Sequence, residues 1–87
     1  MYAVMTTDDI TDREAADQIL MEQAIPMVKQ APGFVGAFWV RFDGDRGTSV
    51  LVFETEEQAR AGAPAVGGGS PGVTFTNVMV GEVAAHA

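Results

Sequence analysis

The chain carries most of its aromatic side chains in one run, Pro32-Gly33-Phe34-Val35-Gly36-Ala37-Phe38-Trp39-Val40-Arg41-Phe42. The Pro-Gly pair indicates a turn, and the nine residues after it have the aromatic and β-branched composition of a strand. Alternation along a strand would place Phe34, Gly36, Phe38, Val40 and Phe42 on one face and Val35, Ala37, Trp39 and Arg41 on the other. Both faces are largely apolar, so we expect both sides of the sheet to be covered.

The segments around this run alternate between strand and helix patterns. They are a strand at about 2–7, a helix at 12–30, the strand at 34–42, a hairpin loop at 43–47, a strand at 48–54, a helix at 56–65, a glycine-rich loop at 67–72 and a strand at 73–84. Thr11 with Glu14, and Thr55 with Gln58, have the spacing of capping boxes at the two helix starts. Pro26 predicts a kink or a break in the first helix.

This order of elements, β-α-β-β-α-β, predicts one α+β domain over residues 1–87. With right-handed crossovers it gives a ferredoxin-like fold, in which both helices cover one face of a four-stranded antiparallel sheet. The other face stays apolar and uncovered. In a chain of 87 residues without cysteine, self-association is the available stabiliser. We therefore predict a homodimer whose sheets pack face to face.

Composition excludes several functional classes. The formal net charge is −7, from twelve acidic and five basic residues, which argues against nucleic-acid partners and anionic membranes. No apolar run reaches the ~18 residues of a membrane span, and the N-terminus lacks signal-peptide features, so we expect a cytoplasmic protein. The absence of cysteine and the single histidine, His86, exclude thiolate and His-pair metal sites, and we expect no metal and no cofactor.

Two segments resemble the dimeric α+β barrel superfamily, in its antibiotic-biosynthesis-monooxygenase-like branch. They are Pro32-Gly33-Phe34-Val35-Gly36 after a long helix, and Phe53-Glu54-Thr55-Glu56-Glu57-Gln58-Ala59-Arg60-Ala61 from the third strand into the second helix. The resemblance implies a homodimer with a pocket between sheet and helices in each protomer. It covers nearly the whole chain, and these motifs are signatures of the fold rather than of the chemistry.

Members of the family include cofactor-independent monooxygenases that oxidise polycyclic phenols, haem-degrading enzymes and isomerases. Haem-degrading members use His and Trp on the second helix and Asn on the first strand. Quinone-forming members place Asn and Trp near the second helix. The corresponding segments here, 56–65 and 2–7, contain none of these residues. The resemblance therefore carries the fold over, and haem degradation is not expected.

Three residues are candidates for a substrate-binding site. Trp39 and Arg41 share one strand face, where they would supply a stacking surface and a cation for an oxyanion. Alternatively, Trp39 fills the core or the dimer interface and Arg41 pairs with a carboxylate. Asn77 lies in the middle of a strand, where asparagine is depleted, so its amide would orient a ligand oxygen or bond across the sheet. Alternation places Asn77 with Val73, Phe75 and Met79, opposite Thr74, Thr76, Val78 and Val80.

Other polar features have plainer interpretations. His86 is the penultimate residue, where chains fray, and the acidic residues Asp8, Asp9 and Asp12 are interpreted as solvated surface and helix-dipole complements. The glycine-rich loop follows a helix and precedes a strand, which is the reverse of a phosphate-binding loop. It is a connector or a mobile lid.

Two functions remain open from the sequence, and no catalytic residue is assigned. The first is a monooxygenase-like enzyme or isomerase that acts on an aromatic or polyketide-like small molecule without a cofactor. The second is a dimeric ligand-binding or structural module without catalysis.

Overall fold

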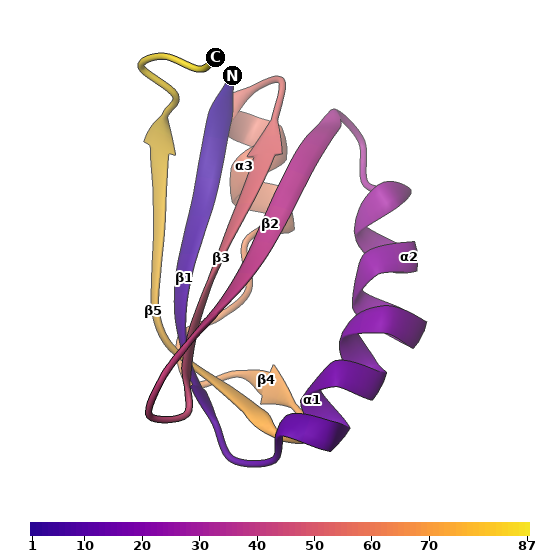
Figure 1. Ribbon diagram of the computed structural model, residues 1–87. Helices are drawn as coiled ribbons and strands as arrows, with labels where there is room; N and C mark the ends of the chain where they lie inside the picture. The colour runs from indigo at the N-terminus through magenta and orange to yellow at the C-terminus, as the bar shows by residue number, and fades with distance from the viewer.

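A computed structural model describes residues 1–87 and shows an α+β fold with a curled antiparallel sheet (Figure 1). The elements are β1 (Tyr2–Ile10), α1 (Arg13–Ile19), η1 (Leu20–Ala24), α2 (Ile25–Lys29), β2 (Phe34–Phe42), β3 (Arg46–Phe53), α3 (Glu56–Gly62), β4 (Gly69–Ser70) and β5 (Val73–Glu82). The sheet order is β2-β3-β1-β5-β4. The predicted α+β class is confirmed, but the sheet has five strands instead of four, because the expected glycine-rich loop contributes the short β4.

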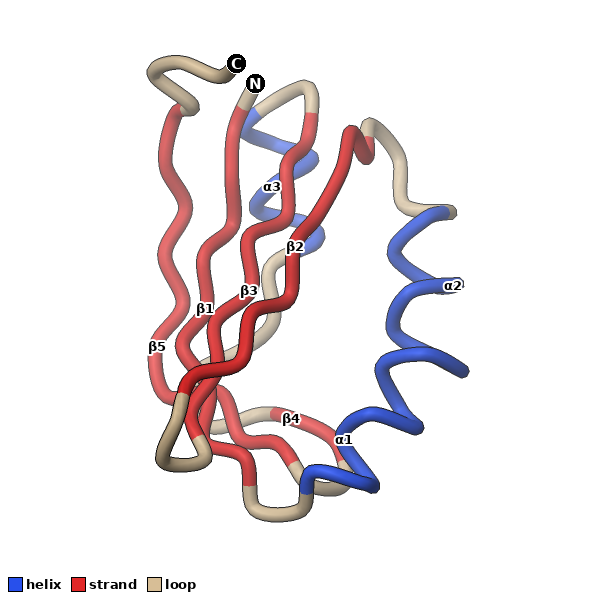
Figure 2. Tube along the Cα trace, in the orientation of Figure 1, coloured by secondary structure: helices blue, strands red, loops and turns tan.

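Helices cover one side of the curled sheet. Figure 2 shows the strands curving around the side on which the long helix and α3 lie. The core under them consists of Val4, Leu51, Phe53 and Ala59, and Val28 of α2 packs against it. The rings of Phe34 and Phe53 meet edge to face at 6.0 Å between centroids, which is the favoured geometry for an aromatic pair.

Two residues separate the first helix from the end of β1, which runs further than the sequence predicts. Because β1 continues to Ile10, the helix begins at Arg13 and its N-cap is Asp12, whose carboxylate accepts from the Ala15 amide at 3.1 Å. The Thr11–Glu14 capping box is therefore wrong. The second box is confirmed, because Thr55 and Gln58 exchange side-chain to backbone bonds of 3.2 Å in both directions.

The long helix passes Pro26 without breaking. The five residues Leu20–Ala24 form a π-helical turn, and the Ile25 amide donates to the carbonyl of Leu20. Proline cannot donate the next helical bond, and the wider turn before it accommodates the ring. α1, η1 and α2 consequently follow one another without a connecting loop, so the expected break is absent.

Two β-bulges change the predicted faces of the strands. The pairing of β2 with β3 shifts between Phe34 and Gly36, which turns Phe34 inward, away from Gly36, Phe38 and the other outward residues of β2. The pairing of β1 with β5 shifts between Thr7 and Asp8, which leaves an additional residue in β5. The simple alternation predicted for these strands is wrong at both places, because a bulge reverses the facing of every residue beyond it.

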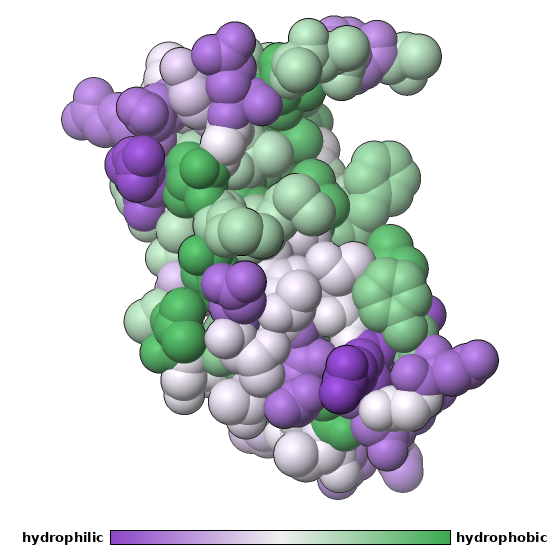
Figure 3. All heavy atoms as spheres, turned by 90° about the vertical axis from the view of Figure 1, so that its left-hand side faces the viewer, coloured by the Kyte–Doolittle hydropathy of each residue, from purple (hydrophilic) through white to green (hydrophobic).

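The outer face of the sheet is apolar and uncovered within one chain. Five large side chains from three strands are exposed on it, namely Met5, Phe38, Val40, Phe42 and Met79. Phe38 is the most exposed of them, at 73%. Figure 3 shows apolar side chains gathered across this side of the molecule, with polar ones toward its ends. The prediction that the strand at 34–42 carries apolar side chains on both faces is confirmed, because Phe38, Val40 and Phe42 are exposed whereas Phe34 and Ala37 pack against the core.

Gly33 joins the long helix to β2, and we expect Gly33→Ala to lower stability by about 1–3 kcal/mol. Its φ of +75° disfavours a side chain, and a Cβ there would lie 1.8 Å from Oε1 of Gln58, which is part of the confirmed capping box. Chemical denaturation measures the loss. In a Gln58→Ala background, the stability lost through Gly33→Ala should fall toward the cost of the positive φ alone. An equal loss in both backgrounds would show that the Gln58 contact is unimportant.

Candidate functional site

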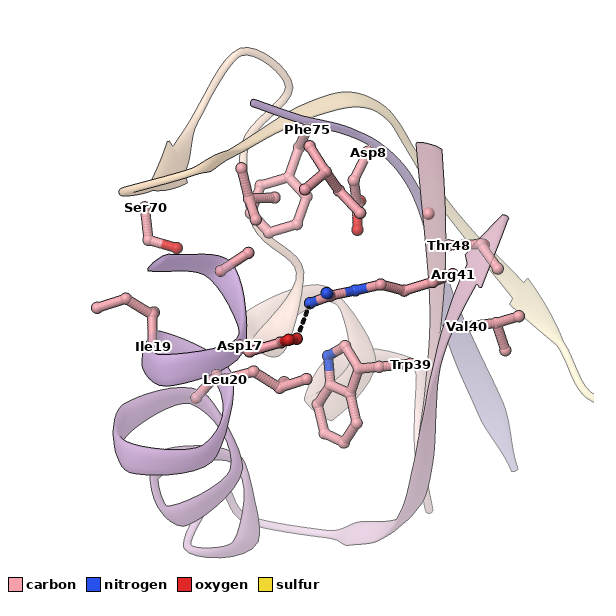
Figure 4. A pocket seen from close by; sticks show the side chains of 15 residues that line it. Asp8, Asp17, Ile19, Leu20, Trp39, Val40, Arg41, Thr48, Ser70 and Phe75 are labelled. Atoms are coloured by element: carbon pink, nitrogen blue, oxygen red, sulfur yellow. Dashed lines mark ion pairs between the residues drawn. The ribbon is translucent and has the colours of Figure 1, made fainter. Parts of the chain in front are cut away.

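A cavity of about 420 Å³ lies between the concave side of the sheet and the first half of the long helix. Its lining combines apolar and charged side chains from α1, η1 and all five strands (Figure 4). The charged and aromatic members of the lining are Asp8, Asp17, Trp39, Arg41 and Phe75. This volume falls in the range of roughly 300–1,000 Å³ that is usual for small-molecule sites.

The register of the sheet places Asp8 and Arg41 in one row across three strands. Asp8 of β1 and Arg41 of β2 are both Cα partners of Gly47 in the strand between them. Glycine contributes no side chain, so no atom from β3 fills the space between the carboxylate and the guanidinium. A Cβ at Gly47 would lie 3.7 Å from Oδ2 of Asp8 and 3.1 Å from the carbonyl oxygen of Val40. The glycine therefore leaves the row without a β3 side chain, although Cδ1 of Ile10 lies 3.3 Å from the same Cβ position.

Arg41 reaches across the cavity to the helix. Its Nη2 atom pairs with Oδ1 of Asp17 at 2.5 Å, and the arginine side chain is 27% exposed while that of the aspartate is 62% exposed. Arginine has five N–H donors in a fixed fork. The single ion pair leaves several of them available, and the guanidinium points into the cavity (Figure 4). The Arg41 guanidinium can therefore donate hydrogen bonds to an oxygen atom of a ligand.

Asp8 is held by a chain of hydroxyl groups on the inner face of the sheet. The Thr6 hydroxyl donates to Oδ1 of Asp8 at 2.9 Å, and the hydroxyls of Thr6 and Ser49 contact each other at 2.5 Å. Thr6 and Ser49 are both buried. Burial raises the pKa of the Asp8 carboxyl above its ordinary value, and the hydrogen bond from Thr6 opposes part of that rise. Asp8 is the one carboxyl of the chain with a clear shift of this kind.

Trp39 forms the apolar wall next to this row. It lies in the row of Thr6 and Ser49, one step along β2 from Arg41, and its indole is partly buried in the cavity lining. The indole ring and the guanidinium point into the same space in Figure 4. The cavity thus offers a flat aromatic surface beside a cation and a carboxylate.

The structure brings two of the three candidate residues together. Trp39 and Arg41 line the cavity, whereas Asn77 does not. The bulge in the β1–β5 pairing places Asn77 opposite Thr7, on the exposed outer face with Met79. The glycine-rich loop contributes Ser70 to the lining. His86 is exposed beyond the end of β5.

Asp8 was missed by sequence reasoning, which assigned it to solvated surface. A usable signal was present, since the even-numbered positions of β1 include the apolar residues Val4 and Ile10. A strand extended to Ile10 would have put Thr6 and Asp8 on that same inward face. Predicting the end of β1 at residue 7 removed Asp8 from the strand.

Asp8→Asn is expected to stabilise the folded chain near neutral pH. Burial raises the folded-state pKa of this carboxyl, so the wild type loses stability as the pH rises from the ordinary Asp pKa through the raised one. The amide does not ionise and escapes this loss. Thermal unfolding across pH should show an advantage for the variant at neutral pH that shrinks in acid. Asp9→Asn, on the exposed face of the same strand, is the control, and equal pH profiles for both variants would contradict the assignment.

The charged groups that face Asp8 across the cavity are Arg41 of β2 and Asp17 of α1.

No group of three or more His, Asp and Glu side chains is arranged to hold a metal ion. No helix of the chain is long and apolar enough to cross a membrane. Comparison of the chain with protein-family models, with curated proteins and with solved structures finds no match.

Proposed function

We propose that the chain is a small enzyme of the cofactor-independent monooxygenase-like or isomerase type, and that it binds an aromatic or polyketide-like molecule in the cavity of each protomer. The observation that carries this proposal is the grouping of Trp39, Arg41 and Asp8 around one cavity of about 420 Å³. The indole would stack on a ring, and the guanidinium would receive a carbonyl or phenolate oxygen. An oxyanion formed on the ligand would gain most from this cation, because much of the surrounding lining is apolar.

The working unit in this proposal is a homodimer in a dimeric α+β barrel arrangement. The order β2-β3-β1-β5 within the sheet, with helices on one side, is the observation that supports a ferredoxin-like layout in this proposal. The exposed Met5, Phe38, Val40, Phe42 and Met79 supply a self-complementary apolar face. Two such faces related by a two-fold axis would give both protomers the cover that a single chain lacks.

The second candidate is a dimeric ligand-binding module without catalysis. It is favoured by the pairing of the polar groups in the cavity, because Arg41 bonds to Asp17 and Asp8 accepts from Thr6. A lining whose charged side chains each have a protein partner suits storage or transport of a ligand as well as its conversion. Turnover of a bound ring compound separates the two candidates.

Arg41→Gln is expected to weaken binding of β-tetralone, a bicyclic aromatic ketone, by about tenfold to a hundredfold, as suits loss of a charged hydrogen bond. Trp39 is the only tryptophan, so its fluorescence reports the titration. Arg46→Gln is the matched control, because Arg46 is exposed and lies outside the cavity lining. Absence of any saturable change in wild-type fluorescence with this ketone and its phenol analogue β-naphthol would contradict the proposed ligand class.

A further inference from the structure

We propose that Asp8 is the proton acceptor of the cavity, taking a proton from a carbon next to the carbonyl of a bound ring compound while Arg41 holds the oxygen that becomes negative. This inference rests on the proposed function and narrows it to reactions that pass through an enolate. The chemical class of substrate is an enolisable aromatic or polyketide-like ketone.

The row Asp8–Gly47–Arg41 supplies the geometry. Both charged residues are Cα partners of the same glycine, so their backbones are two strand spacings apart, roughly 10 Å. In Figure 4 the Asp8 carboxylate points into the cavity toward the space beside the Arg41 side chain, which extends across it to Asp17 of the helix. A ketone placed there would have its oxygen near the guanidinium and its acidic C–H near the carboxylate. The indole of Trp39, in the neighbouring row, would hold the ring in the plane between them.

The hydrogen bonds of Thr6 and Ser49 determine which carboxylate oxygen of Asp8 is free to accept the proton. Thr6 uses its single hydroxyl proton on Oδ1 of Asp8, so in the Thr6–Ser49 contact the donor must be Ser49. The chain therefore runs from Ser49 to Thr6 to Oδ1. Oδ2 has no hydrogen bond to a protein side chain, and it is the Asp8 oxygen beside Gly47, 3.7 Å from the position of a Cβ there. Thr6 and Ser49 are positioning residues that orient the carboxylate.

The proposed step is balanced without any co-reactant. The C–H bond of the substrate breaks, its proton forms an O–H bond with Oδ2 of Asp8, and the electron pair moves onto the carbonyl oxygen as an enolate beside Arg41. Return of the same proton to the original carbon restores the ketone, and its return to a conjugated carbon gives an isomer. Burial of Asp8 raises its basicity, which favours proton transfer to it near neutral pH. Arg41 and Asp17 are the other charged groups facing this space.

The test is exchange of the ring-adjacent protons of β-tetralone in deuterium oxide, followed by proton NMR. Wild-type protein should accelerate exchange above the buffer rate. Asp8→Asn should lower the protein-catalysed exchange rate by about 10²–10⁴-fold. Asp9→Asn is the matched control, since it removes a carboxylate from the exposed face of the same strand. It should exchange at the wild-type rate.

The pH profile of the wild type provides a readout that needs no variant. The rate should rise through a single ionisation above the ordinary Asp pKa and then level off. A rate that only follows hydroxide concentration would overturn the inference, even if Asp8→Asn failed to fold. Binding of β-tetralone with equal exchange by wild type and a folded Asp8→Asn would overturn the role of Asp8 and leave the proposed ligand site standing. Absence of binding would overturn both.

Discussion

Phe38→Asp is expected to dissociate the proposed homodimer and raise its dissociation constant at least a hundredfold. Phe38 is 73% exposed in the single chain and lies on the apolar outer face of the sheet. A two-fold interface contains the substituted residue of both protomers. Each of the two carboxylates would be buried against the partner's sheet without a counter-charge. An uncompensated buried charge costs on the order of 3–5 kcal/mol. Because about 1.4 kcal/mol corresponds to a tenfold change in the dissociation constant, this cost corresponds to at least about a hundredfold weaker dimer.

Light scattering over a dilution series measures this effect. Val66→Asp is the control, because Val66 is a similarly exposed apolar residue, at 63%, that lies between α3 and β4 and outside the strands. It should leave the dimer intact. A wild type that is monomeric throughout the micromolar range, or a Phe38→Asp variant that dimerises as tightly as Val66→Asp, would contradict the face-to-face arrangement.

Phe53→Ala is expected to lower the free energy of unfolding by about 3–5 kcal/mol, the usual loss for a buried phenylalanine. Phe53 is 1% exposed, belongs to the core cluster and packs edge to face on Phe34. A Cβ at Gly62 of α3 would lie 2.7 Å from its ring, so the helix packs directly on the ring and loses this contact in the variant. For a domain of this size, such a loss lowers the Tm by about 12 °C or more.

Differential scanning calorimetry at several protein concentrations distinguishes this loss from a loss of assembly. Phe53→Ala should shift the unfolding temperature downward at every concentration by a similar amount. Phe38→Ala, which truncates an exposed ring on the outer face, should lower it mainly through a changed concentration dependence, because dimer formation is linked to folding by mass action. A Phe53→Ala shift of a few degrees only would show that the core is centred elsewhere.

The sequence predicts the elements of the fold well where local patterns are strong. The Pro32-Gly33 turn, the run at 34–42 and the Thr55–Gln58 capping box are local signals, and each appears in the structure at the predicted place. Apolar residues on both faces of the strand were also readable, because alternation depends only on neighbouring residues. These features need no knowledge of the partner strands.

The parts that could not be predicted depend on pairing between strands. One bulge is set by how β2 pairs with β3 and the other by how β1 pairs with β5, and each reverses the facing of the residues beyond it. That is why Asn77 moved to the outer face and Phe34 to the core. The inward facing of Asp8 follows from the unbroken alternation of β1 and was readable, whereas its position opposite Gly47 depends on register. The short β4 arises only because Gly69 and Ser70 meet the start of β5.

Residue-resolved NMR titration with β-tetralone tests most directly the central claim, that the cavity beside the Asp8–Gly47–Arg41 row is the ligand site. The expected result is a saturable shift of the Trp39 indole N–H and of the backbone amides of Arg41 and Gly47. The amide of Asn77, on the opposite face of the sheet, should stay unchanged. Shifts confined to Phe38 and its neighbours on the outer face, or no saturable shift at all, would contradict it.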